Sequence, residues 1–206
     1  MRPRATADYQ DRHGSFWTAN GQWFYASNDR SHSTDTHNRG VFRDTVVGYV
    51  HYFANNSIAA VVIDGTGVGE FRAAHIEAEN YMRIAGGGAR KLHLPERNDA
   101  FVIEVVSADA AALHYPHVVG AGARLALIAA NAGPHSATVV ARRGAADGAE
   151  LARCSVEPSG GDFSRTTCRL ALAASDEADL DLVLTFEAHE TGAQLALQID
   201  SLALVE

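Results

Sequence analysis

Positive charge is in short supply in this 206-residue sequence. Lys and Arg number 17 against 25 Asp and Glu, which gives a formal net charge of −8 and a pI near 5.6. Proteins that bind nucleic acid present a basic surface to the phosphates. The charge balance therefore argues against DNA or RNA as a partner.

Long apolar runs are also lacking. No stretch approaches the roughly 20 apolar residues that a membrane helix needs, so we expect no membrane-spanning segment. The first residues, Met1–Asp8, carry positive charge with no apolar run behind it, which is not the pattern of a secretory signal. Either the protein stays inside the cell or its true start lies upstream of Met1.

Cysteine is scarce, and the 2 cysteines, Cys154 and Cys168, are too few to fix the cellular compartment by number. They lie on two consecutive predicted strands joined by residues 157–162. Neighbouring strands can bring such positions within bridging distance, and a closed loop of roughly 15 residues would contribute about 3 kcal/mol when oxidised. The residues alone do not decide between a disulfide and two free buried thiols. The disulfide would favour a secreted or periplasmic location.

Helical periodicity is rare, and strand patterns take its place. From residue 14 to residue 63, short aromatic and β-branched runs alternate with turns, and Asn20-Gly21 predicts a tight type I′ hairpin. We expect four antiparallel strands, the last over Ile58–Ile63, which is the size of one propeller blade. Large side chains fall on both faces, so the blade would need neighbours on both sides.

A glycine-spaced connector, Asp64–Gly69, predicts a domain boundary near residue 70. The blade would occupy residues 1–69, and a second domain residues 70–206. Beyond the connector, sustained alternation, for example over 180–186 and 194–205, predicts eight or nine short strands. The predicted fold class is all-β: a four-stranded antiparallel propeller-type blade followed by a jelly-roll β-sandwich.

The two predicted β-structures meet at His75–Tyr81. In a continuous strand, Glu77, Glu79 and Tyr81 would share one face. Two carboxylates side by side are either solvated or held by a cation that prefers hard oxygen ligands, such as calcium. The residues alone leave both interpretations open.

The run Ile76–Tyr81, followed by Gly86–Gly88, resembles the opening of a family 6 carbohydrate-binding module, which is a β-sandwich. The resemblance extends from about residue 75 to the end of the sequence. It implies a structural calcium ion held by three carboxylates: Glu77, Glu79 and Asp200.

The first part of the chain resembles the last blade of a family 43 glycoside hydrolase, on the motifs His13–Trp17, Gly21–Tyr25 and Gly48–Tyr52. These propeller enzymes include arabinofuranosidases, xylosidases and arabinanases, and several carry a family 6 type module directly behind the propeller. They invert the anomeric centre with a pair of carboxyl groups. In the family those acids come from earlier blades, so we expect this chain alone to be inactive. His13 matches the family histidine that reaches the propeller centre.

Family 6 modules bind sugar with two aromatic rings and an amide at the loop end of the sandwich, because a ring face packs on the CH face of a pyranose. The resemblance places Phe163, Tyr115 and Gln198 at those positions, although either ring could be a core residue instead. Related modules also carry a spaced cysteine pair around a Gly-Gly loop, which supports the disulfide.

Three functions are compatible with these patterns. The chain could be the C-terminal part of a family 43 type glycosidase acting on arabinoxylan, xylan or arabinan. It could be a free-standing carbohydrate-binding module, or a structural sandwich that only supports a propeller. The first function implies that missing propeller blades, or another chain, cover the faces of the blade.

Overall fold

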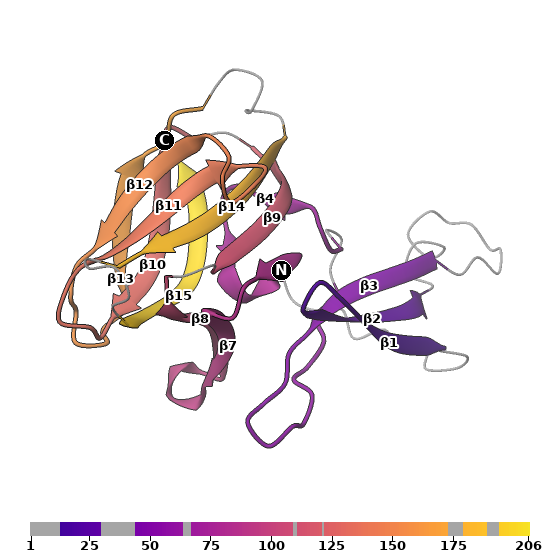
Figure 1. Ribbon diagram of the computed structural model, residues 1–206. Helices are drawn as coiled ribbons and strands as arrows, with labels where there is room; N and C mark the ends of the chain where they lie inside the picture. The colour runs from indigo at the N-terminus through magenta and orange to yellow at the C-terminus, as the bar shows by residue number, and fades with distance from the viewer. Residues whose placement is uncertain are drawn as a thin grey trace. The chain divides into compact units, whose positions relative to one another are not determined.

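The chain divides into two compact units, Met1–Val68 and Gly69–Glu206, each built from β-strands (Figure 1). Among the residues described, no helix is long and apolar enough to cross a membrane. The computed structural model describes residues 13–29, 44–63, 67–108, 111–120, 122–172, 179–188 and 194–206.

The first unit is a three-stranded antiparallel sheet in the order β1-β2-β3. The β1–β2 turn confirms the predicted type I′ hairpin, because Asn20 (φ 52°) and Gly21 (φ 83°) both have positive φ angles. The strands are β1 (Gly14–Ala19), β2 (Gln22–Asp29) and β3 (Asp44–Val50).

The predicted fourth strand of this sheet is not formed. Over the described residues 51–63 the chain makes only an isolated bridge between Tyr52 and Ile58, at the base of a turn. It then passes close to β3, where a Cβ atom on Gly48 would lie 2.8 Å from Cγ1 of Val61. The segment around Val61 packs closely over Gly48 and forms no hydrogen-bonded ladder with β3. The predicted four-stranded blade is therefore corrected to a three-stranded sheet.

Aromatic side chains cover both faces of the three-stranded sheet. On one face Phe16 contacts Tyr25, with ring centroids 4.8 Å apart, and on the other Trp17 stacks on Phe24 at 5.4 Å. Phe16, Trp17 and Trp23 remain 48%, 39% and 42% exposed. The sheet therefore leaves large apolar surface in water on both sides.

The second unit is a sandwich of two six-stranded sheets (Figure 1). The first sandwich sheet has the order β13-β10-β15-β8-β7, with β5 also pairing β15. Its strands are β5 (Ile76–Glu77), β7 (Ala89–Leu94), β8 (Ala100–Ser107), β10 (Arg124–Asn131), β13 (Ser164–Arg169) and β15 (Gln194–Val205).

The second sandwich sheet has the order β12-β11-β14-β9-β4, with β6 also pairing β9. Two short 3-10 turns complete the unit: η1 (Ala78–Asn80) and η2 (Pro95–Arg97). The strands are β4 (Phe71–Arg72), β6 (Arg83–Ala85), β9 (Ala112–Val119), β11 (Ala137–Arg143), β12 (Glu150–Val156) and β14 (Leu180–Glu187).

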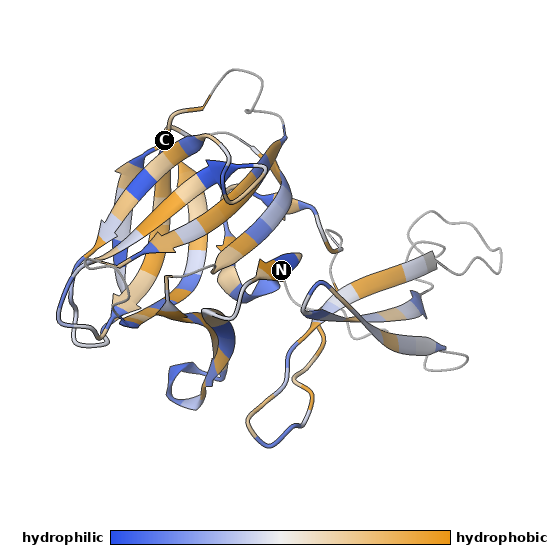
Figure 2. Ribbon diagram, viewed as in Figure 1, coloured by the Kyte–Doolittle hydropathy of each residue, from blue (hydrophilic) through white to orange (hydrophobic). Residues whose placement is uncertain are grey.

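The core lies between the two sheets, and on several strands apolar side chains alternate with polar ones (Figure 2). On β14, Leu180 and Leu182 are at most 1% exposed, whereas Asp181 between them is exposed. This is the alternation that the sequence shows, and it confirms the predicted sandwich.

A disulfide joins Cys154 on β12 to Cys168 on β13, with the two Cα atoms 5.3 Å apart. The two strands belong to opposite sheets, so the bond links the layers at one edge of the sandwich. The sequence analysis left the disulfide and two free thiols open and did not assign the two strands to sheets.

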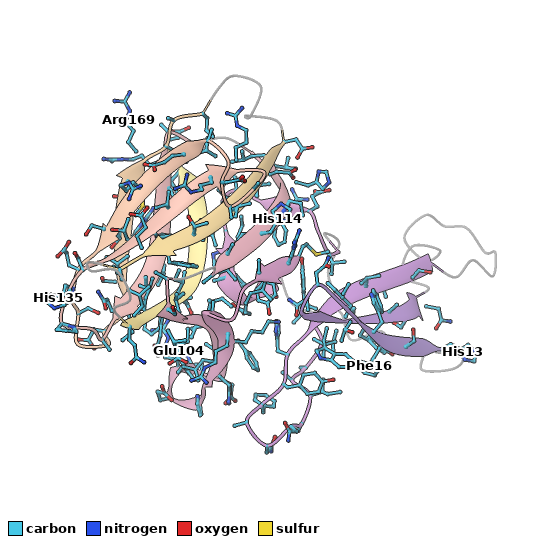
Figure 3. The ribbon with its side chains drawn as sticks, in the orientation of Figure 1. His13, Phe16, Glu104, His114, His135 and Arg169 are labelled. Carbon is cyan, nitrogen blue, oxygen red and sulfur yellow. A yellow bond between two sulfur atoms is a disulfide. The ribbon has the colours of Figure 1, made fainter. Side chains whose placement is uncertain are left out.

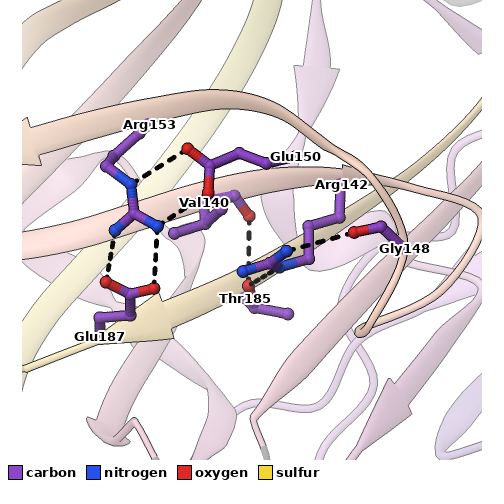
Figure 4. A network of polar contacts seen from close by, with 7 residues as sticks. All are labelled: Val140, Arg142, Gly148, Glu150, Arg153, Thr185 and Glu187. Carbon is purple, nitrogen blue, oxygen red and sulfur yellow. Dashed lines mark hydrogen bonds and ion pairs between the residues drawn. The ribbon is translucent and has the colours of Figure 1, made fainter.

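Charged side chains occupy the outer face of the second sandwich sheet (Figure 4). Arg153 makes ion pairs with both Glu150 and Glu187, and Arg142 donates to the hydroxyl of Thr185 at 3.2 Å. These groups are each matched within the sheet. We interpret them as cross-strand stabilisation of a solvated face.

Candidate functional site

The entry to the sandwich differs from the predicted strand. β5 ends at Glu77, and the chain turns through η1, so that Glu77 is exposed while Glu79 and Tyr81 are 7% and 4% exposed. The 3-10 turn breaks the two-residue period. The prediction that Glu77, Glu79 and Tyr81 share one face is therefore wrong.

A buried asparagine, Asn131, forms hydrogen bonds with the β12–β13 loop, which carries Phe163. Asn131, at the end of β10, donates from its side chain to the carbonyl oxygens of His135 and Val156, both at 2.9 Å. Its backbone carbonyl accepts from the N–H of Ser159 at 2.8 Å. Asn131 thus fixes the strand end next to which the β12–β13 loop folds, a role that the sequence analysis missed.

Phe163 is half-buried, and a cation covers one face of its ring. The guanidinium carbon of Arg97, from η2, lies 3.9 Å from the ring centroid. Nη2 of Arg97 also lies 3.4 Å from Oδ2 of Asp200. Among the described residues, Nε of Arg97 is buried and has no hydrogen-bond partner, so Arg97 has donor capacity left.

Gln198 belongs to a polar row that crosses the same sheet. It lies opposite Glu104 on β8, and Glu104 lies opposite Arg90 on β7. Nε of Arg90 donates to Glu104 at 2.7 Å (Glu104 is labelled in Figure 3). Gln198 also lies opposite Ala130, one residue before Asn131.

Asp200 is the extra residue of a β-bulge. On the β10 side, Ile199 pairs with Ala129 and Ser201 with Ile128, which leaves Asp200 between them. Here β15 also changes its other partner from β8 to β5. Bulges commonly re-aim a side chain, and this one places Asp200 beside Arg97.

Tyr115 is a core residue, which corrects its prediction as a sugar platform. The ring is 0% exposed and packs edge-on against Phe71, with centroids 5.5 Å apart. Its hydroxyl donates to the carbonyl oxygen of Ala78 at 2.7 Å. A ring enclosed in this way has no face to offer a ligand.

His13 lies just before β1 and is exposed (Figure 3). Its backbone N–H donates to the side-chain oxygen of Asn28 at 2.7 Å, and its carbonyl accepts from the N–H of Asn28. These contacts fix the backbone of His13. Its predicted place at a propeller centre stays a prediction.

The implied calcium ligands are close together in the fold but are turned toward separate partners. Glu77 lies opposite Ser201, the residue after Asp200. The pKa of Glu79 is raised to about 8, chiefly by burial, and the charges of Glu77 and Asp200 contribute to this rise. Calcium takes roughly six to eight converging oxygens.

In the part of the chain that the structure describes, no group of three His, Cys, Asp or Glu side chains is placed to hold a metal ion. The structural calcium ion at Glu77, Glu79 and Asp200 stays a prediction.

Several solved carbohydrate-binding modules have a similar fold over about two thirds of this chain. The family 6 module CsCBM6-3 from Clostridium stercorarium, solved with cellobiose, has a TM-score of 0.55 and 19% identity, over 66% of this chain and 97% of that one. The β-1,3-glucan binding module from Bacillus halodurans has a TM-score of 0.57 and 15% identity, over 66% and 99%. The sandwich has the fold of a family 6 carbohydrate-binding module.

One similar structure extends beyond this family 6 type sandwich. A family 43 arabinoxylan arabinofuranohydrolase from Bacillus subtilis, solved with cellotetraose, matches 95% of this chain with a TM-score of 0.55 and 16% identity. The chain spans 41% of the length of that enzyme. No protein-family model matches the sequence, and no curated protein matches it either.

Proposed function

We propose that this chain is the C-terminal part of a family 43 type glycoside hydrolase, in which the sandwich binds plant polysaccharide for the enzyme. The observation that carries the proposal is the likeness over 95% of the chain to an arabinofuranohydrolase, because it takes in both units and not the sandwich alone. Arabinoxylan, xylan and arabinan are the proposed ligands.

The three-stranded sheet supports this origin. Phe16, Trp17 and Trp23 leave apolar surface exposed on both of its faces, and each large apolar side chain contributes about 1.5 to 3 kcal/mol when buried. In the proposed enzyme, further propeller blades or another chain cover these faces, and His13 lies near the propeller axis.

The proposed sugar site is the Phe163 end of the first sandwich sheet. An aromatic ring supplies stacking surface, while Gln198 and Glu104 supply hydroxyl partners. Arg97 covers one ring face at 3.9 Å. A pyranose therefore uses the other face or displaces Arg97, whose Nε can then donate to a sugar oxygen. The proposal needs no calcium ion.

Affinity electrophoresis of the full chain in gels containing each polysaccharide tests this site. We expect at least one polysaccharide to retard the wild type. Phe163→Ala should weaken binding by about 2 kcal/mol, roughly thirtyfold, as for a central aromatic anchor. Val119→Ala, which trims an exposed side chain on the opposite sheet, is the matched control and should bind like the wild type.

A purely structural sandwich is the second candidate, and the cover of Arg97 over Phe163 favours it. In that case no polysaccharide retards the wild type, and Phe163→Ala changes only stability. Retardation that Phe163→Ala leaves unchanged would place the binding surface elsewhere on the chain.

The purified chain should not hydrolyse aryl arabinosides or aryl xylosides. Inverting glycosidases need two carboxyl groups roughly 6.5 to 9.5 Å apart, and the resemblance places those groups in earlier blades. Colorimetric release of the aryl leaving group is the measurement, with the buffer alone as the baseline. Hydrolytic activity that is above the baseline and co-purifies with the chain would contradict the proposal that the catalytic carboxyl groups lie outside it.

A further inference from the structure

The β7–β8 loop, residues 95–99, carries the arginine that covers the proposed sugar platform. Arg97 is the one half-buried residue of this loop, and the other four residues are exposed. Its guanidinium group lies over the ring of Phe163. The loop therefore folds back onto the protein through a single side chain.

The guanidinium group of Arg97 lies where a stacked sugar would lie. Its carbon is 3.9 Å from the centroid of the Phe163 ring. Carbon atoms in van der Waals contact are about 3.5 to 4.0 Å apart, so no layer of atoms fits between the two groups. Arg97 also pairs with Asp200, but it is the ring contact that occupies the stacking surface. Arg97 and a pyranose on this face therefore exclude each other.

The closed position of the loop has two unfavourable features. Nε of Arg97 is buried and has no hydrogen-bond partner within the described part of the chain, and an unpaired buried donor is destabilising. Asn98 and Asp99, which follow Arg97, both have a φ angle of 58°, in the left-handed region that residues other than glycine rarely adopt. Movement of the loop away from Phe163 would expose Nε to water. A ligand can therefore displace Arg97 at a small cost.

We propose that Arg97 is an internal competitor for sugar at Phe163, so that the β7–β8 loop moves before a pyranose stacks on the covered face. This role rests on the proposed function, because it concerns the same site. When only a fraction of the protein is competent to bind, the apparent affinity falls by that fraction. Arg97 thus lowers the affinity of the site and selects ligands whose further contacts, for example with Gln198 and Glu104, offset its displacement.

Affinity electrophoresis of the full chain in gels containing arabinoxylan, xylan or arabinan tests the proposal. Arg97→Ala should bind about fivefold more tightly than the wild type, the factor that corresponds to the loss of one competing cation–π contact. Arg97→Ala combined with Phe163→Ala should bind no more tightly than Phe163→Ala alone. Arg169→Ala is the matched control and should bind like the wild type, because Arg169 is exposed at the far end of β13 (labelled in Figure 3).

The outcomes separate this proposal from the proposed function. Equal or weaker binding by Arg97→Ala, with retardation of the wild type, would overturn the competition and leave a sugar-binding sandwich. Absence of retardation for both proteins with all three polysaccharides would overturn the proposed function, and the competition with it. Retardation of Arg97→Ala alone would support the competition in its strongest form.

Nuclear magnetic resonance observes the closed loop without any sugar. Protons that lie over the face of an aromatic ring resonate at high field, so the side-chain signals of Arg97, assigned by their loss in Arg97→Ala, should be shifted upfield. Phe163→Leu keeps an apolar side chain without a ring and should abolish this shift. Identical Arg97 signals in the wild type and in Phe163→Leu would show that the loop is open in solution and would overturn the proposal.

Discussion

Tyr115→Ala should lower the free energy of unfolding by about 3 to 5 kcal/mol, the range for removing a large buried ring. Tyr115 is 0% exposed and is packed against Phe71, so the substitution leaves a cavity that the sandwich cannot fill without moving its sheets. Urea denaturation monitored by far-UV circular dichroism, which reports β-structure, measures the change in the free energy of unfolding.

The variant that separates packing from binding is Tyr115→Phe. It keeps the ring and removes only the hydroxyl that donates to the buried carbonyl of Ala78. This loss should lower the free energy of unfolding by about 1 to 3 kcal/mol. The folded variant should be retarded by polysaccharide as strongly as the wild type is. If Tyr115→Phe folds normally and loses sugar binding, the hydroxyl reaches the ligand and the core assignment of Tyr115 is incorrect.

Reduction of the Cys154–Cys168 disulfide should lower the free energy of unfolding by about 3 kcal/mol, since it opens a loop of roughly 15 residues. The bond joins the edge strands of opposite sheets, and in the described chain β13 pairs only with β10. Without the bond, β13 and the preceding Phe163 lose one of their anchors. Reduced protein should therefore also bind polysaccharide more weakly.

Urea denaturation with and without reductant measures the stability change. The double variant Cys154→Ala/Cys168→Ala is the control: it should unfold like the reduced wild type and be insensitive to reductant. An identical urea midpoint for oxidised and reduced wild type would contradict a structural role for the bond.

Local patterns in the sequence were enough to predict the sandwich. Along β14 the apolar residues recur at every second position from Leu180, and Asn20-Gly21 determines the hairpin turn. Both features depend on the backbone period and on allowed φ angles, which neighbouring residues determine. The predicted strand over Ile58–Ile63 failed because an apolar run does not specify whether the chain pairs or only packs.

The candidate site was less predictable, because its contacts join distant segments. Arg97 and Phe163 lie 66 positions apart in the sequence. They stack only because the folded chain brings η2 next to the β12–β13 loop. The 3-10 turn after Glu77 likewise follows a tertiary contact, because β5 pairs with Ser201 and Leu202 of the distant strand β15. Tyr115 could have been recognised: it shares the parity of the core residue Leu113 on β9.

The most direct test of the account is calorimetric titration of the full chain with oligosaccharides derived from arabinoxylan, xylan and arabinan. We expect a saturable heat of binding with at least one of them in the wild type, and loss of that heat in Phe163→Ala with its fold intact. No heat with any of the three ligands, from protein that melts cooperatively, would contradict a carbohydrate-binding sandwich and leave the structural one.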